Sequence, residues 1–140
     1  MNNFSATLDA IAKPFSNLAP WLLRMSLGVA FFLHGYGKFP LPPEKMVSWF
    51  GSIGVPAPEL ISSMVAIGEV AAGIGIIVGG ILATSLGHLI TRLSGGAVAV
   101  IMVGALSIAH SDWFITTKLF TSEQIFLLAL GLYFAIKGND

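Results

Sequence analysis

The feature that most restricts how this chain can fold is a series of four apolar stretches, each close to the length needed to cross a bilayer. They cover roughly residues 18–36, 60–83, 88–109 and 122–137. A transmembrane helix needs about 20 apolar residues, with a range of about 17–25, so the ends of the short fourth stretch are expected among the lipid headgroups. We therefore predict an all-α integral membrane protein, a four-helix bundle that forms a single domain over residues 1–140.

The composition supports the lipid bilayer as the main partner and excludes several other classes of protein. Charged residues make up 10% of the chain, whereas a soluble domain carries about 25%. The formal net charge is zero, so nothing favours a nucleic-acid partner. The chain has no cysteine, which excludes disulfides, thiol redox chemistry and iron–sulfur clusters held by cysteine.

The connections between the apolar stretches indicate how the stretches are arranged. The five residues "TSLGH" (84–88) join the second stretch to the third and require an antiparallel hairpin. Prolines interrupt the first connection, but Met46, Trp49 and Ile53 recur there at helical spacing, which predicts a short interfacial helix over about residues 43–53. For residues 1–17 two interpretations stay open, a second interfacial helix or an irregular terminus.

The distribution of basic residues predicts the orientation in the membrane. Loops on the cytoplasmic side carry an excess of Lys and Arg. Four such residues lie on the side shared by both termini and three lie on the opposite side, so we predict a multi-pass protein with both termini in the cytoplasm. The first group is Lys13, Arg24, Arg92 and Lys137, and the second is Lys38, Lys45 and Lys118.

Glu69 is the most informative polar residue, because it lies about nine residues inside the second apolar stretch. At 1.5 Å per residue this is about 13 Å deep, close to the bilayer midplane. An unpaired carboxylate there would cost at least about 2.5–3.5 kcal/mol. We therefore expect Glu69 to face the interior of the bundle and to be protonated or paired.

Other polar residues share helical faces with small residues and converge on one end of the predicted bundle. In the first stretch a face runs from Arg24 to Lys38 and includes His34. The third stretch places His110 at the same end. The candidate buried polar site consists of Glu69, Arg24, His34, Lys38 and His110, and the secondary candidates are Arg92, Asp112 and Glu123.

Each of these residues also has a structural interpretation. Arg24, Arg92 and Lys38 lie near the ends of apolar stretches, where long basic side chains reach the interface. Glu123 suits the start of a helix as a negative charge. Hydrogen bonds between helices are favoured over metal or haem ligation for His34 and His110, so we predict no metal site and disfavour haem.

The motifs together resemble those of a known family. They are "R-x3-G-x5-HG-x2-K" (24–38), "GVPAP" (54–58), "GE-x3-G-x5-G" (68–79), Arg92, a third stretch ending in His110, and "SEQIFLLALGLY" (122–133). This pattern resembles the DoxX family of small four-helix bacterial and archaeal membrane proteins. At its end the chain reads "AIKGND", whereas members often carry a glycine-rich turn followed by Ser-Leu-Asp.

The resemblance implies a location in the plasma (inner) membrane and a link to redox physiology. The family name comes from a subunit of a thiosulfate:quinone oxidoreductase, and other members are described as membrane partners of redox or oxidative-stress proteins. Carrying an activity over to this chain is analogy, because a fold does not specify chemistry. The sequence contains no flavin, nicotinamide or metal motif, so whether the chain is an enzyme stays open.

Three functions follow as alternatives. The first is an accessory or anchor subunit of a membrane-associated oxidoreductase, with a redox partner protein and with quinone as the candidate cofactor near Glu69. There, a protonatable carboxylate beside histidine could relay protons. The second is a module that binds or transports a lipid or another small molecule, and homo-oligomerisation would help it to form a path. The third is a purely structural membrane component.

Overall fold

The computed structural model describes residues 2–140, and within that range it contains helices and loops but no strand. The elements in chain order are α1 (Asn3–Ala12), a 3₁₀ turn (Lys13–Phe15), α2 (Leu18–Tyr36), α3 (Glu44–Ser52), α4 (Pro58–Ile81), α5 (Ser85–Gly104), a π-helical turn (Ala105–Ala109), a second 3₁₀ turn (Ser111–Ile115), α6 (Lys118–Thr121) and α7 (Gln124–Lys137). The prediction of an all-α fold is confirmed.

Within residues 2–140, three helices are long and apolar enough to cross a membrane. They are α2, α4 and the continuous helix Ser85–Ala109, which combines α5 with the π-helical turn. α7 is apolar but has only 14 residues, or about 21 Å of helix, which is shorter than the hydrocarbon core of a bilayer. A fourth membrane crossing therefore stays a proposal.

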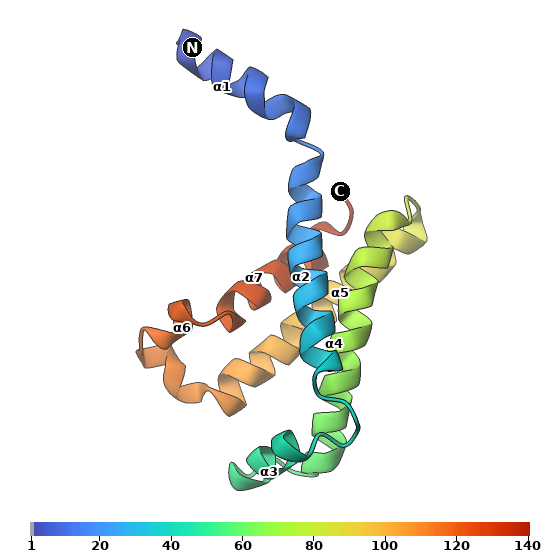
Figure 1. Cartoon of the computed structure of the whole chain (residues 1–140), viewed down its shortest axis with the longest axis vertical. Helices are drawn as coiled ribbons and strands as arrows, with labels where there is room; N and C mark the ends of the chain where they lie inside the picture. The colour runs from blue at the N-terminus through green and yellow to red at the C-terminus, as the bar shows by residue number, and fades with distance from the viewer. Residues whose placement is uncertain (1) are drawn as a thin grey trace.

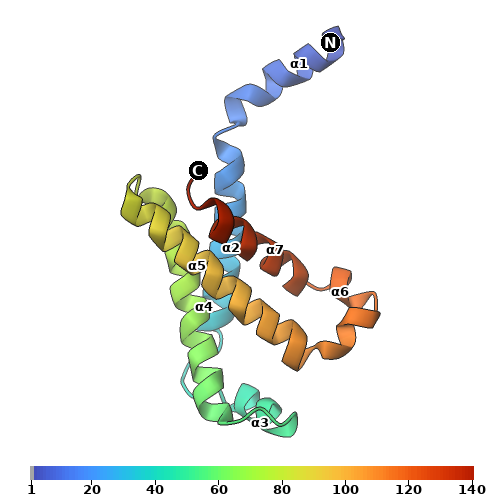
Figure 2. The same ribbon diagram turned by 180° about the vertical axis from the view of Figure 1, so that it is seen from behind.

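The long helices pack side by side in chain order. α2 packs along α4, α4 along α5, and α5 along α7, whereas α2 and α7 touch over a small area. α1 extends away from the other helices at one end of the molecule, and α3 lies at the opposite end, beside the start of α4 (Figures 1 and 2). The molecule thus has two distinct ends, one at the start of α2 and one near α3.

Buried residues of α2, α4, α5 and α7 form a small apolar core. Leu27 and Phe31 of α2, Ile76 of α4, Val98 of α5 and Phe134 of α7 are buried there almost completely. Many other large apolar side chains on these helices are exposed. An exposed apolar exterior is unfavourable in water but matches the acyl chains of a bilayer.

Glycines let the backbones of α2 and α4 approach very closely. A Cβ atom added to Gly35 would lie 2.6 Å from the carbonyl oxygen of Ala66, and one added to Gly73 would lie 2.6 Å from that of Gly28. Cβ atoms do not approach backbone atoms so closely, so only glycine fits at either position. Small residues at helix crossings are typical of membrane proteins, where close packing replaces the hydrophobic effect between helices.

Candidate functional site

The centre of the candidate site is an ion pair between a buried acid and a lysine. Glu69, in the middle of α4, is 3% exposed. The Nζ atom of Lys38, which follows α2 in the chain, lies 2.5 Å from Glu69 Oε2 and also donates to the carbonyl oxygen of His34 at 3.0 Å. The buried carboxylate of α4 therefore has a cationic partner, and each charge lowers the cost of burying the other.

His34 lies near this pair but bonds to a different acid. Its Nε2 atom is 2.9 Å from Oε1 of Glu123, the residue that precedes α7. This contact links the C-terminal end of α2 to the start of α7. Beside it in the chain, the side-chain oxygen of Gln124 is buried without a hydrogen-bond donor, so this end of the molecule retains an unused acceptor.

His110 is held between tryptophans at the same end. It follows the π-helical turn, its ring stacks on Trp113 with centroids 3.8 Å apart, and the ring of Trp49 from α3 lies 5.5 Å away. Burial lowers the pKa of the His110 imidazole, and the nearby Asp112 carboxylate opposes this by raising it. The net effect is a lowered pKa, which favours the neutral ring between the two indoles.

This shift predicts a loss of stability on acidification. Because the pKa of His110 is lower in the folded chain, the unfolded chain binds a proton more readily, and stability falls as the pH drops below about 6.5. Replacing His110 with Gln should make the dependence of stability on pH less steep between about pH 7.5 and pH 5. Thermal unfolding of both proteins across this range tests the prediction, since the other histidines are common to both. Equal slopes for the two proteins would contradict it.

Arg24 lies away from the other candidates, toward the opposite end. It donates to the carbonyl oxygen of Ile76, to Thr91 Oγ1 at 3.0 Å and to Asn139 Oδ1 at 3.0 Å. Ile76 lies seven residues from Glu69 on α4, a rise of about 10 Å. The structure therefore separates the predicted polar residues into two groups.

The secondary candidates are all exposed. Arg92 of α5 donates to the carbonyl oxygen of Ile136 at 2.9 Å. Asp112 lies in the second 3₁₀ turn beside His110, and Glu123 binds His34. Within residues 2–140, no three His, Asp or Glu side chains come together in a way that could hold a metal ion.

An apolar cavity adjoins the ion pair. It has a volume of about 310 Å³ and lies between α3, the first half of α4 and the C-terminal half of the helix Ser85–Ala109. Its polar lining residues are Lys38 and His110, and its aromatic ones are Trp49 and Phe50. The lining also includes Val100 and Ile108, which are 74% and 60% exposed on the outer surface. The cavity therefore opens sideways, toward the region of the acyl chains.

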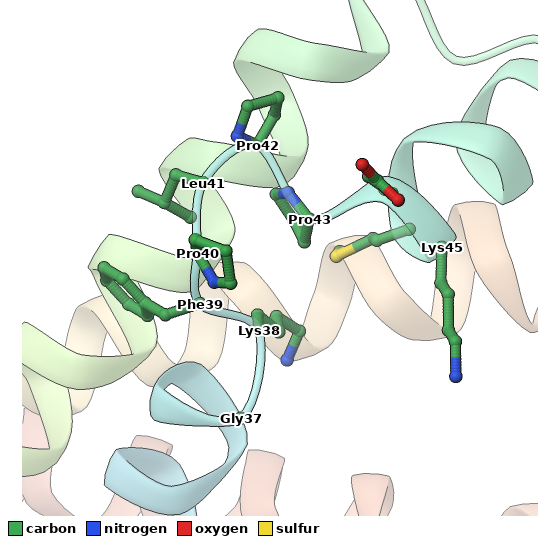
Figure 3. A pocket seen from close by; sticks show the side chains of 10 residues that line it. Gly37, Lys38, Phe39, Pro40, Leu41, Pro42, Pro43 and Lys45 are labelled. Carbon is green, nitrogen blue, oxygen red and sulfur yellow. The ribbon is translucent and has the colours of Figure 1, made fainter.

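A second hollow lies on the other side of Lys38. The loop between α2 and α3 and the first residues of α3 enclose about 560 Å³, with the side chains of residues 37–46 around it (Figure 3). Lys38 and Met46 line both this hollow and the apolar cavity. Lys38 thus stands where the exposed loop surface meets the apolar interior, with its ammonium group bound to Glu69.

Comparison with known proteins supports the family resemblance. The DoxX family model matches residues 19–111, which is more than half of the chain. The chain belongs to the DoxX family. This DoxX protein is also 33% identical, over 85 residues, to a Bacillus subtilis (strain 168) protein named "Putative oxidoreductase CatD". The alignment covers 61% of this chain and 54% of that protein, or about half its length. No solved structure matches the chain.

Several residues of the two polar groups in this DoxX protein were not predicted from the sequence. The sequence pattern places Trp49 only in the interfacial helix, and it does not indicate Trp113, Thr91 or Asn139 as site residues. The signal for Asn139 was available, because glycine followed by asparagine directly after a helix is typical of a C-terminal cap. Thr91 had no comparable signal, since threonine occurs widely in transmembrane helices.

Proposed function

We propose that this protein is the membrane-embedded accessory subunit of an oxidoreductase and that its apolar cavity binds the head group of a quinone. Membership of the DoxX family and the similarity to a Bacillus subtilis protein named as an oxidoreductase support a role in redox physiology. The observation that carries the proposal is that Lys38 contacts both the cavity and the buried acid. It lines the apolar cavity and is bonded to the buried Glu69 carboxylate.

The cavity fits the chemistry of such a ligand. Ligand cavities have volumes of about 300–1,000 Å³, so a volume of about 310 Å³ accommodates one ring and the start of a tail. The rest of an isoprenoid tail would leave through the opening beside Val100 and Ile108. Trp49 and Phe50 offer aromatic surface to the ring, and the Lys38 ammonium group would donate a hydrogen bond to a carbonyl oxygen.

The residues of this chain would handle protons rather than electrons. A bound quinone supplies two-electron redox chemistry, and the electrons would come from a partner protein. Glu69 would accept or release a proton through Lys38, which borders the hollow of the exposed loop. The buried acid would therefore exchange protons with water without being exposed to it.

Four crossings with both termini in the cytoplasm are part of this proposal. Asn139, which follows α7, bonds to Arg24 near the start of α2, so α7 returns the chain to the end where α2 begins. An even number of crossings likewise places both termini on the same side of the membrane. Labelling of single cysteines placed in residues 2–12 and at Asp140, in intact and opened cells, tests this topology.

The cavity allows a matched test of quinone binding. A Cβ at Gly104 or at Gly96 would meet no atom within 4 Å, but only Gly104 lines the cavity. We expect Gly104→Leu to fill the cavity and to weaken binding of a short-chain ubiquinone at least about tenfold, or 1.4 kcal/mol. Gly96→Leu should bind like the wild type. Quenching of tryptophan fluorescence in detergent measures both affinities.

The outcome of this titration also separates the alternatives. If the wild type binds no quinone, or if both leucine variants bind it equally, the quinone proposal fails. The sideways opening of the cavity favours lipid or small-molecule binding or transport as the second candidate function. Retention of a phospholipid by the wild type and its loss in Gly104→Leu, measured by mass spectrometry, would support that candidate. An empty cavity in every protein would leave a structural role.

A further inference from the structure

We propose that the polar group around Arg24 is a binding site for a phosphate group, and that the chain's own Asn139 occupies the position of the ligand. We call this group the Arg24 site and define it as Arg24, His88, Thr91 and Asn139. It lies at the end of the molecule where α2 begins and the helices α4 and α5 are joined (Figures 1 and 2). It is separate from the proposed quinone cavity.

The first observation is a buried positive charge that no acid balances. Arg24 is 5% exposed. Its hydrogen bonds go to a backbone carbonyl, a hydroxyl and an amide oxygen, all of them neutral, and aromatic rings of Trp21 and Phe134 lie 5.7 and 4.7 Å from the guanidinium carbon. Within residues 2–140 no carboxylate is paired with it. An oxyanion is the partner that a buried guanidinium binds most strongly.

The second observation is the way in which Asn139 fills the site. Its Oδ1 atom accepts from Thr91 Oγ1 at 2.6 Å and from Arg24 at 3.0 Å. One oxygen thus receives a hydroxyl and a guanidinium donor, which is the arrangement that an oxyanion oxygen requires. The Asn139 amide nitrogen donates to the carbonyl oxygen of Gly79 at 2.8 Å, a bond that holds the asparagine in place.

The backbone places Asn139 in the site through a turn that only glycine favours. Gly138 has a φ of +67°, and a Cβ there would lie within 3 Å of the His88 ring. The turn directs the residues after α7 back over the Arg24 site. Asn139 thus follows a single glycine, and rotation of the Gly138 backbone would move it out of the site. Asn139 and a ligand would therefore compete for the same hydrogen-bond donors.

A polar cavity gives a ligand access to this point. It has a volume of about 630 Å³ and is lined by residues 83–85, His88, Asn139 and Asp140. The first turn of α5, capped by Thr84, borders it, and helix N-termini favour anions. Asp140 is the one acid in the lining, and it lies 3.9 Å from His88 Nδ1. It would move out with Asn139 when a ligand enters.

Phosphate is the chemistry shared by two sources of ligand. One is the headgroup of an acidic phospholipid, which would be able to reach Arg24 at its depth in α2. The other is a free oxyanion that enters from the aqueous side through the cavity. The proposal covers the phosphate group, and the experiment separates its sources.

Thermal unfolding of the full chain in a neutral detergent tests the proposal. The probes are inorganic phosphate, compared with sodium chloride at equal ionic strength, and dioctanoyl phosphatidic acid, compared with dioctanoyl glycerol. At least one phosphate probe should raise the unfolding midpoint of the wild type by about 3 °C or more. A shift with both probes indicates a free oxyanion site, and a shift with the lipid alone indicates a headgroup site.

Asn139→Asp makes the test specific, because it places a carboxylate on Arg24 and Thr91 in the same volume, although it gives up the amide N–H bond to the Gly79 carbonyl oxygen. We expect this variant to show no shift with either phosphate probe, because its own carboxylate already occupies the donors of Arg24 and Thr91. Arg92→Gln is the matched control, because it removes an exposed arginine from the same end and should keep the wild-type response. No shift in the wild type with either probe, or an undiminished shift in Asn139→Asp, would overturn the proposal.

Discussion

A protein that carries Lys38→Met together with Glu69→Leu is expected to be more stable than a protein that carries Lys38→Met alone. Glu69 is buried in α4 and Lys38 is its cationic partner at 2.5 Å. Removal of one partner of a buried ion pair leaves the other charge without compensation and costs about 3–5 kcal/mol. Replacement of both partners by apolar residues removes that penalty and is commonly neutral or stabilising.

The wild type, the single variants Lys38→Met and Glu69→Leu, and the double variant form a double-mutant cycle. Unfolding in mixed micelles of a neutral detergent and dodecyl sulfate measures the four stabilities, including that of the wild type. Lys45→Met is the control, because Lys45 is exposed and its ammonium group has no ion-pair partner within residues 2–140. Additive effects in the cycle would show that the pair is not coupled and would remove the support for a proton path through it.

Gly73→Val is expected to prevent α2 and α4 from packing together. A Cβ at this position would lie 2.6 Å from the carbonyl oxygen of Gly28, which belongs to the backbone and cannot rotate away as a side chain does. Either the helices separate or the crossing is rebuilt, at a cost of about 3 kcal/mol or more. The loss should be larger than for any substitution on the outer surface, because α2 and α4 pack along each other and their backbones approach closely at this glycine.

Gly96→Val provides the matched comparison. Both glycines lie in the interior of long helices, so the difference in helix propensity between glycine and valine is the same for both. A Cβ at Gly96 meets no atom within 4 Å. We expect this variant to elute as a single species from a sizing column and to unfold like the wild type, whereas Gly73→Val should aggregate. Similar behaviour of the two variants would contradict the close approach of α2 and α4.

The two ends of the molecule carry different kinds of polar chemistry. Near α3 the Lys38–Glu69 ion pair borders an apolar cavity, which suits a ligand with a polar head and an apolar tail. At the other end the hydrogen-bond partners of Arg24 among residues 2–140 are neutral groups, which suits an anion. Because the two sites lie on different levels of α4, variants at one end can serve as controls for the other.

Most of the fold was accessible from the sequence because a membrane restricts the structures that can form. Long apolar stretches must become helices in lipid, where every backbone polar group needs a partner within the segment. The bounds of α2 and the position of α3 accordingly lie close to those predicted from hydropathy and helical spacing. An acid inside a long apolar stretch was expected to be turned away from lipid for the same reason, and Glu69 is buried.

The partners of the polar residues were decided by the tertiary structure alone. Helical periodicity assigns residues to a face of one helix, but it does not set the level at which a neighbouring helix crosses that face. Arg24 and Lys38 share a face of the same segment, yet Lys38 bonds to Glu69 while Arg24 reaches Asn139, more than a hundred positions along the chain. These levels depend on where glycines allow close approach and on how the tail turns at Gly138, and both are properties of the packed molecule.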